Sequence, residues 1–172
     1  KFMLNVISSL SVFQLLKENN INKLTIKWPN DIMSGKEKIS GILIENSVKG
    51  KLINHSIIGV GINVNQKKFK DLPNATSLFI QTGLEFSLDS LASRLAEIFS
   101  NNFSLYDKNE KNLLEYYNSE LFLKNKYANF TGLDNKNFSG KIICVNKKGE
   151  LRIRKTNEEE INYMENTIKF VP

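Results

Sequence analysis

The stretch that decides the fold runs from Lys27 to Asn46 and reads KWPNDIMSGKEKISGILIEN. Residues 24–28, which lead into it, alternate between apolar and polar types, and a period of two predicts a half-buried strand. The next three residues, PND, favour a turn because proline, asparagine and aspartate each suit turn geometry. We therefore expect Asn30 and Asp31 at the rim of a sheet.

Two more strands are expected after this turn, at residues 39–45 and 52–64, joined through loops that contain Gly35 and Gly50. Three consecutive strands with such loops predict an antiparallel meander. Before them, residues 2–20 carry apolar side chains at a spacing near 3.6, which predicts an amphipathic helix.

The second half of the chain is expected to be helical first and then rich in strands. Residues 65–87 read as a long irregular stretch, and loops of that length are often functional. Ser87 is a suitable N-cap for a helix with an apolar stripe, and another helix is expected over residues 109–123. The apolar stripe of the first of these helices consists of Leu88, Leu91, Leu95, Ile98 and Phe99.

The tail favours short strands with glycine-containing turns, which suit a small barrel packed on the larger part of the chain. We therefore predict two domains, residues 1–123 and residues 124–172. Neither an internal repeat nor a low-complexity linker is visible.

Composition limits the classes of function. The net charge is +6, but 21 of the 24 basic residues are lysines spread along the chain, which favours a solvated surface over a nucleic-acid site. A lysine-rich face could still attract an acidic partner such as a carrier domain.

With one cysteine, Cys144, and one histidine, His55, the chain supports neither an internal disulfide nor a Cys- or His-based metal site or triad. Cys144 suits a small buried hydrophobe and His55 a sheet surface. No apolar run is long enough to cross a membrane, so we expect a cytoplasmic protein.

Glycine recurs at the predicted strand edges, in KISGILIE at 38–45 and in GVGINVN at 59–65. A flat ligand ring can press against strand backbone where no side chain intervenes, and the freed backbone groups can then bond it. Taken singly, each glycine is equally suited to a bulge or a tight twist. A Gly-x-Gly alone is weak evidence, and the absence of G-x-G-x-x-G followed by a helix argues against a dinucleotide fold.

Four motifs in order, KWPND, KISGILIE, GVGINVN and ATSL at Ala75–Leu78, resemble the biotin protein ligases. The resemblance implies an α/β (α+β) fold with a class II synthetase-like, mixed or antiparallel sheet, followed by a small SH3-like β-barrel. These ligases join biotin to ATP, forming biotinyl-5'-AMP with Mg²⁺, and pass the biotinyl group to a lysine of a biotin carboxyl carrier protein. Residues 1–22 match neither the family's Ser/Thr pair nor its Gly-Arg-rich loop. We therefore expect the carboxyl-terminal portion of a ligase, inactive or poorly active alone.

By this resemblance Lys38 is the catalytic cation that touches both the biotin carboxylate and the phosphate. The chemistry needs one, since two like charges about 4 Å apart repel by roughly 4 kcal/mol at an effective dielectric near 20. A compact ammonium on a flexible stem suits that task. The alternative is that Lys38 is one surface lysine among 21.

The resemblance places Asp31 and Asn30 near the nucleotide phosphates, with any Mg²⁺ held through the phosphates close to Asp31. Asp31 would be catalytic, because an acceptor lysine is protonated near neutral pH and a nearby carboxylate helps it lose the proton. The alternative is a turn in which both side chains cap their own backbone. Lys27 and Trp28 could equally be structural, with Lys27 bracing Asp31.

The remaining candidate residues are assigned to biotin and the nucleotide by the same resemblance. Asn63 carries a donor and an acceptor that can read an adenine edge, and a small side chain at Ala75 lets adenine approach. Asn30 is assigned to the nucleotide as well. The biotin-binding set is Lys38, Gly41, Leu43, Gly59, Gly61 and Ile62.

Two alternatives from other classes stay open: a lipoate or octanoyl transferase-type relative, which shares the fold, and a non-catalytic binding or regulatory module. KWPND and GVGIN are not motifs of the lipoate branch. The expected partners are biotin, ATP and a carrier protein, with a homodimer possible and with no membrane or nucleic acid.

Overall fold

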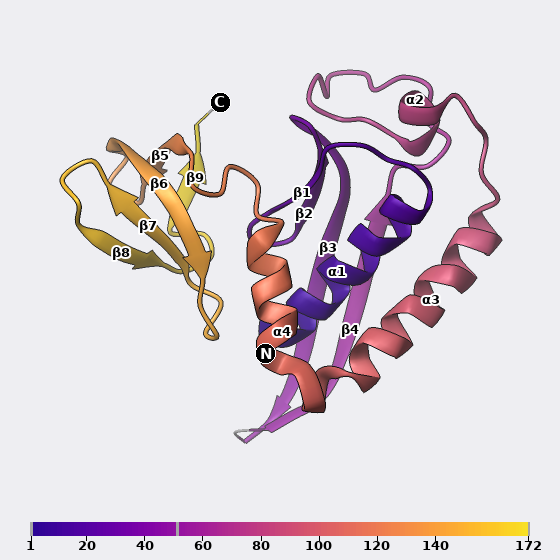
Figure 1. The fold of residues 1–172 in the computed structure, drawn as a ribbon, viewed down its shortest axis with the longest axis horizontal. Helices are drawn as coiled ribbons and strands as arrows, with labels where there is room; N and C mark the ends of the chain where they lie inside the picture. Colours follow the sequence, from indigo (N-terminus) through magenta and orange to yellow (C-terminus); the bar gives the residue numbers. More distant parts are fainter. Residues whose placement is uncertain (1, 51, 172) are drawn as a thin grey trace.

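The computed structural model describes residues 2–50 and 52–171 and consists of two antiparallel sheets with helices (Figure 1). The larger part contains α1 (Phe2–Glu18), β1 (Leu24–Lys27), β2 (Asp31–Ser34), β3 (Glu37–Lys49), β4 (Leu52–Ile62), α2 (Leu78–Thr82), α3 (Leu88–Ser104) and α4 (Tyr106–Ser119). The tail contains β5 (Tyr127–Gly132), β6 (Asn137–Val145), β7 (Leu151–Lys155), β8 (Glu160–Tyr163) and β9 (Ile168–Phe170). The expected mixed α/β fold with antiparallel sheets is confirmed.

The first sheet is a four-stranded meander in the order β1-β2-β3-β4. Our prediction of three strands was wrong, because β2 was missed. The turn is confined to residues 28–30, and Asp31 is already the first residue of β2, where it pairs with Gly41. A four-residue strand directly after a proline-containing turn has too few residues to show a period of two.

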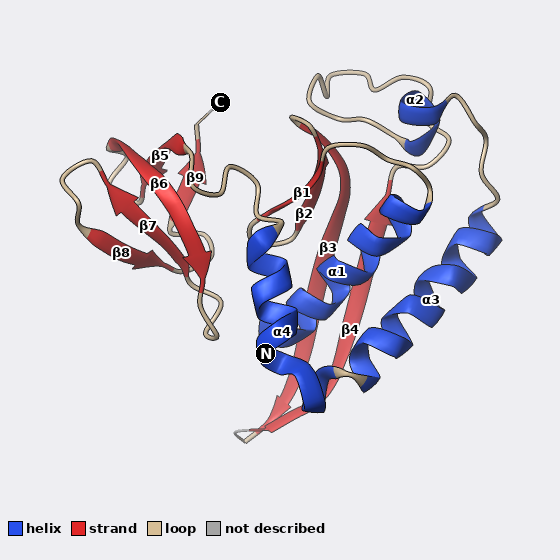
Figure 2. Ribbon diagram, in the orientation of Figure 1, coloured by secondary structure: helices blue, strands red, loops and turns tan. Residues whose placement is uncertain are grey.

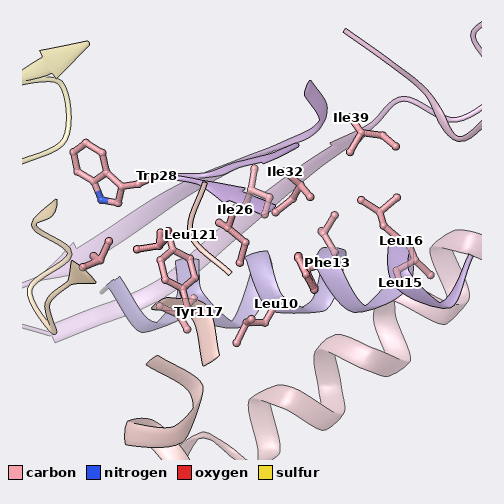
Figure 3. Close-up of a cluster of buried hydrophobic side chains, with 14 of the residues drawn as sticks. Leu10, Phe13, Leu15, Leu16, Ile26, Trp28, Ile32, Ile39, Tyr117 and Leu121 are labelled. Carbon is pink, nitrogen blue, oxygen red and sulfur yellow. The ribbon is translucent and has the colours of Figure 1, made fainter. Parts of the chain in front are cut away.

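Helix α1 lies at the centre of the larger part, packed against β1, β2 and β3 and also against α3 and α4. It is therefore buried on most sides, where we expected an amphipathic helix with one polar face. Figure 3 shows Leu10, Phe13 and Leu16 of α1 gathered with Ile26 and Ile32 of the sheet. Serines on α1 are tolerated in this core because their hydroxyls donate to the carbonyls four residues earlier.

The stretch expected to be irregular, residues 65–87, contains the short helix α2, which Ser77 caps at its amino end and Gly83 ends in a left-handed conformation. Ser87 caps α3 as predicted, accepting a hydrogen bond from the amide of Ser90. Leu88, expected in the apolar stripe of α3, is instead exposed.

The tail folds as a five-stranded sheet in the order β8-β7-β6-β5-β9. We expected a small SH3-like barrel, but among the described strands no pairing joins β8 to β9, so the sheet is not closed into a barrel. The sequence of β5, YANFTG, lacks a clear alternation of apolar and polar residues. Cys144 on β6 is half-buried, where full burial was expected.

Residues 120–125 join the two sheets, as the connection from α4 in Figure 2 shows. The amide of Ile26 in β1 donates to the carbonyl of Glu120 at 2.7 Å, and Asn125 donates to the carbonyl of Ile142 in β6 at 2.8 Å. Buried side chains of both sheets form one hydrophobic cluster. The tail is thus docked on the larger part, as expected. Among the described residues, no helix is long and apolar enough to cross a membrane.

Candidate functional site

The outer face of β3 and β4, which α1 does not cover, carries a patch without side chains. Gly41 lies opposite Gly61, and Leu43 lies opposite Gly59. Leu43 is 63% exposed, whereas its neighbour Ile42 is 3% exposed and points into the core. We call Gly41, Gly59 and Gly61 the glycine floor.

Packing within the chain does not require glycine at two of these positions. A Cβ atom on Gly61 would come no closer than 3.8 Å to any neighbouring heavy atom, and the same holds for Gly59. Those are ordinary contacts, and neither residue has a positive φ. These two positions therefore lack side chains although the fold would accept them, which favours a role in leaving space for a ligand.

Lys38 and Asp31 form an ion pair above the floor. The Lys38 Nζ lies 2.5 Å from the Asp31 Oδ1, with side-chain exposures of 47% and 27%. A Cβ on Gly41 would stand 2.9 Å from that Nζ, so the lysine side chain lies directly over Gly41. A side chain at this position would displace the ammonium from the place that it occupies beside Asp31.

The backbone of Lys38 is held by the segment 72–77. Its amide donates to the carbonyl of Asn74 at 2.7 Å, and its carbonyl accepts from the amide of Thr76 at 2.9 Å. Ala75, between these two residues, forms an isolated parallel bridge with Lys38. Asn63 ties the same segment to β4, since its Nδ2 donates to the Thr76 carbonyl at 2.9 Å. The ATSL motif thus anchors the cationic residue.

Two cavities meet at this ion pair. One, of about 580 Å³, lies between the floor and the segment 69–75, and the other, of about 670 Å³, opens over the floor and β2. Both are lined by Lys38, Gly41 and Gly61. The first is lined in addition by Ser40, Ile62, Asn63, Phe69, Leu72, Pro73, Asn74 and Ala75. The second is lined in addition by Asn30, Asp31, Ile42, Leu43, Gly59 and Val60.

All ten residues proposed from the sequence therefore line one cavity or both. The side chains of two of them are already engaged within the chain. The Asn30 Nδ2 donates to the Ile42 carbonyl at 2.5 Å, and one amide hydrogen of Asn63 is used on Thr76. These bonds tie Asn30 to β3 and Asn63 to the segment 72–77.

The structure adds residues that the motifs did not single out, and three of them, Phe69, Leu72 and Pro73, form an apolar lip on the first cavity. The signal for them was the length of the irregular stretch that contains them. Lys27 does not brace Asp31, since its Nζ lies 5.0 Å from the centre of the Phe170 ring in the tail. His55 is exposed on the sheet surface, as expected.

The described lining of the two cavities contains one cationic side chain, Lys38, and one carboxylate, Asp31. The arrangement can receive an anion, because an incoming carboxylate or phosphate can replace Asp31 as the partner of the ammonium. Among the described residues no group of three or more His, Cys, Asp or Glu side chains is placed to hold a metal by itself.

Comparison with known proteins agrees with this geometry. Residues 1–63 match the model of the biotin/lipoate A/B protein ligase family. The chain is 28% identical over 166 residues to the bifunctional ligase/repressor BirA of Bacillus subtilis, covering 90% of this chain and 49% of that protein. A biotin–[acetyl-CoA-carboxylase] ligase of Paracoccus denitrificans is 40% identical over 42 residues, which are 24% of this chain and 18% of that one. The chain thus spans about half the length of the BirA relative.

Solved structures show the same fold. The apo biotin protein ligase of Aquifex aeolicus superposes with a TM-score of 0.82 at 23% identity, covering 99% of this chain and 75% of that one. The same enzyme in complex with biotin and ATP superposes with a TM-score of 0.81, also at 23% identity, covering 99% and 71%. The amino-terminal residues 1–63 thus match the biotin/lipoate A/B protein ligase family, and the chain as a whole shares the fold of the biotin protein ligases.

Proposed function

We propose that the protein carrying this chain is a biotin protein ligase, which activates biotin with ATP and transfers it to a lysine of a biotin carboxyl carrier protein. The observation that carries the proposal is the position of Lys38, whose ammonium lies over the glycine floor at the junction of two cavities. Relatives named as biotin ligases, one of them solved with biotin and ATP, support it.

In the first half-reaction the biotin carboxylate attacks the α-phosphorus of ATP, a new P–O bond forms and pyrophosphate leaves. Both reactants are anions, and their mutual repulsion falls when one ammonium lies between them. Lys38 is placed for this, provided that it exchanges Asp31 for the substrates. Because Asn74 and Thr76 hold its backbone, the flexible side chain of Lys38 moves from a fixed base.

The two cavities divide the substrates. The bicyclic ring of biotin lies on the bare floor beside Leu43, and the adenine enters the cavity lined by Phe69 and Ala75. The exposed faces of the glycines allow close approach of a flat ring. The Oδ1 of Asn63 is then available to accept from the adenine amino group.

In the second half-reaction the acceptor amine attacks the acyl carbon of biotinyl-5'-AMP, a C–N bond forms and AMP leaves. Once Lys38 has turned to the substrates, the Asp31 carboxylate is free to orient the acceptor ammonium and to take its proton. The ion pair therefore links the two half-reactions. When a substrate anion binds the Lys38 ammonium, it displaces the Asp31 carboxylate, which then becomes available for the transfer step.

The residues present fit Mg²⁺ in one mode. This ion commonly takes one or two carboxylates together with substrate phosphates, and Asp31 supplies the one carboxylate in the described cavity lining. Bound there, Mg²⁺ would neutralise phosphate charge. No step above depends on it.

The wider expectations belong to this proposal. The open five-stranded sheet stands where the resemblance places an SH3-like domain, and residues 1–123 and 124–172 are proposed as the two domains. The cytoplasm is the compartment that the reaction implies, and the acetyl-CoA-carboxylase carrier is the proposed acceptor.

The test is biotin-dependent exchange of pyrophosphate into ATP by the full-length protein, with lipoate as the competing substrate. We expect exchange with biotin and none with lipoate. Lys38→Ala is expected to lower the rate about 100-fold, the typical effect of losing one charge-stabilising donor. Exchange that needs lipoate, or a Lys38→Ala rate within threefold of the wild type, would contradict the proposal.

A further inference from the structure

The segment from Trp28 to Asn30, which connects β1 to β2, is held by contacts from outside its own sheet. The indole N–H of Trp28, a residue only 5% exposed, donates to the carbonyl of Gly149 at 3.0 Å. The hydroxyl of Tyr117 on α4, which is fully buried, donates to the carbonyl of Pro29 at 3.1 Å. The position of this segment is therefore set partly by α4 and by the turn between β6 and β7.

That turn, residues 146–150, is itself rigidly held. The side-chain Oδ1 of Asn146 accepts from the amides of Lys148 and Glu150 at 2.9 and 3.1 Å. The amide of Gly149 donates to the Asn146 carbonyl at 2.9 Å. An asparagine that satisfies several turn amides at once leaves the loop little freedom. The carbonyl that receives the indole is thus a fixed acceptor.

The turn is also fixed to the larger part of the molecule. On α4, Asn118 bonds both backbone groups of Val145, as donor at 3.0 Å and as acceptor at 2.6 Å. At Gly149, with φ of +88°, a Cβ would stand 2.7 Å from the ring of Phe2. Phe2 in turn meets Tyr117 edge to face at 5.8 Å. A glycine is needed here, because only a residue without Cβ brings the turn this close to α1 and to the indole.

The contact lies two to three residues from the site. Asn30, two residues after Trp28, exchanges hydrogen bonds with Ile42, its carbonyl accepting at 3.0 Å and its Nδ2 donating at 2.5 Å. Asp31 follows and pairs with Gly41 of the floor. A shift of the indole must therefore be absorbed within residues 29–31. Lys38 is anchored independently, through Asn74 and Thr76.

We infer that the turn Asn146–Glu150 of the tail sheet is a positioning element for Asn30 and Asp31, acting through the indole of Trp28. Its functional half rests on the proposed ligase reaction, in which Asp31 serves the transfer step. The tail thereby contributes to transfer without placing a side chain on the reacting atoms.

The test uses Trp28→Phe in the full-length protein, which removes the N–H donor and keeps an aromatic ring. Losing one neutral hydrogen bond corresponds to a factor of about five, so amide hydrogen exchange at Ile42 is expected to rise about fivefold. Transfer of biotin from isolated biotinyl-5'-AMP to a carrier domain is expected to fall about tenfold, because small misplacements of a reacting group are costly. Pyrophosphate exchange, which depends on Lys38, stays within twofold.

Gly149→Ala displaces the carbonyl that accepts the indole hydrogen bond of Trp28. We expect this variant, too, to lose transfer activity while its pyrophosphate exchange stays within twofold of the wild type. The matched control is Asn102→Ala, which removes a hydrogen bond of equal length, 3.0 Å, from α3 to Ser11. Asn102 lies in the helical layer. The rates of both half-reactions and the rate of amide hydrogen exchange at Ile42 should therefore match the wild type within twofold.

If Trp28→Phe leaves the rate of amide hydrogen exchange at Ile42 unchanged, the positioning role is overturned, whatever the enzymatic activity of the variant. A parallel loss of both half-reactions would overturn it too, since a merely structural contact acts on both. If the wild type shows no biotin-dependent exchange of pyrophosphate, the proposed function fails, and amide exchange at Ile42 still decides whether the turn positions the segment.

Discussion

The substitution Gly61→Ala distinguishes two reasons for a glycine at this position: leaving room for a ligand, or meeting a requirement of the fold. Gly61 is exposed on β4 and lines both cavities. A Cβ there meets nothing closer than the Gly41 carbonyl oxygen at 3.8 Å, and the residue has no positive φ. Alanine also restricts the unfolded chain by about 0.4–1 kcal/mol relative to glycine. We therefore expect the free energy of unfolding to stay constant or to rise by about 0.5 kcal/mol.

Ligand binding is expected to change in the opposite direction. A methyl group on the floor stands where the ring of biotin must press, and overpacking of this kind costs about 1–3 kcal/mol. At about 1.4 kcal/mol per factor of ten, the affinity for biotin should fall roughly 5- to 150-fold. Isothermal titration with biotin gives the dissociation constant, and thermal denaturation of the same samples gives the stability.

The control is His55→Ala, on the same strand and exposed, but not among the residues lining either cavity. Its dissociation constant for biotin should lie within twofold of the wild type. Wild-type affinity in a folded Gly61→Ala protein would refute the reasoning. A loss of stability that accompanies the loss of affinity would make this glycine structural.

Asp31→Asn should leave pyrophosphate exchange within about threefold and lower single-turnover transfer about 100-fold, since it removes the proton acceptor and spares Lys38; equal losses in both assays would contradict the division of roles. Burial, with a smaller effect of the Glu165 carboxylate, raises the pKa of the Tyr117 phenol far above its usual value. The folded state therefore holds this proton above pH 10, where the unfolded state releases it, so stability is full below about pH 10 and falls by about 1.4 kcal/mol per pH unit above it. Urea denaturation from pH 9 to 11 should show that fall in the wild type and a shallower one in Tyr117→Phe, and identical slopes would argue against it. Residues 1–172 expressed alone should form biotinyl-5'-AMP at less than about a hundredth of the full-length rate, because their described cavity lining carries one cation for two anions; equal rates would show that Lys38 suffices.

Parts of the fold could be predicted because their signals are local. The period near 3.6 in α1 and the cap at Ser87 each depend on a few neighbouring residues. Strand β2 and the burial of α1 on most sides could not be predicted in this way. Both depend on partners distant in sequence: β2 exists through its pairing with β1 and β3, and α1 is covered by α3 and α4.

The candidate site divides in the same manner. The motifs named ten residues that line the two cavities, because each was chosen for a chemical group that is written in the chain. The lip of Phe69, Leu72 and Pro73 was announced only by the length of its loop. The engagement of Asn30 and Asn63 within the chain was not visible in the motifs, since their hydrogen-bond partners lie on other strands and segments.

By itself the sequence determined which chemical groups this protein brings to its site: one ammonium, one carboxylate and a set of missing side chains. Tertiary structure alone decided that Lys38 lies over Gly41. It also decided that packing within the chain would accept a side chain at Gly59 and at Gly61. It alone brought Gly149 to within 3.0 Å of the indole of Trp28, 121 residues away in the chain. The physical reason is that chemical identity belongs to single residues, whereas distance and burial arise when separate segments pack together.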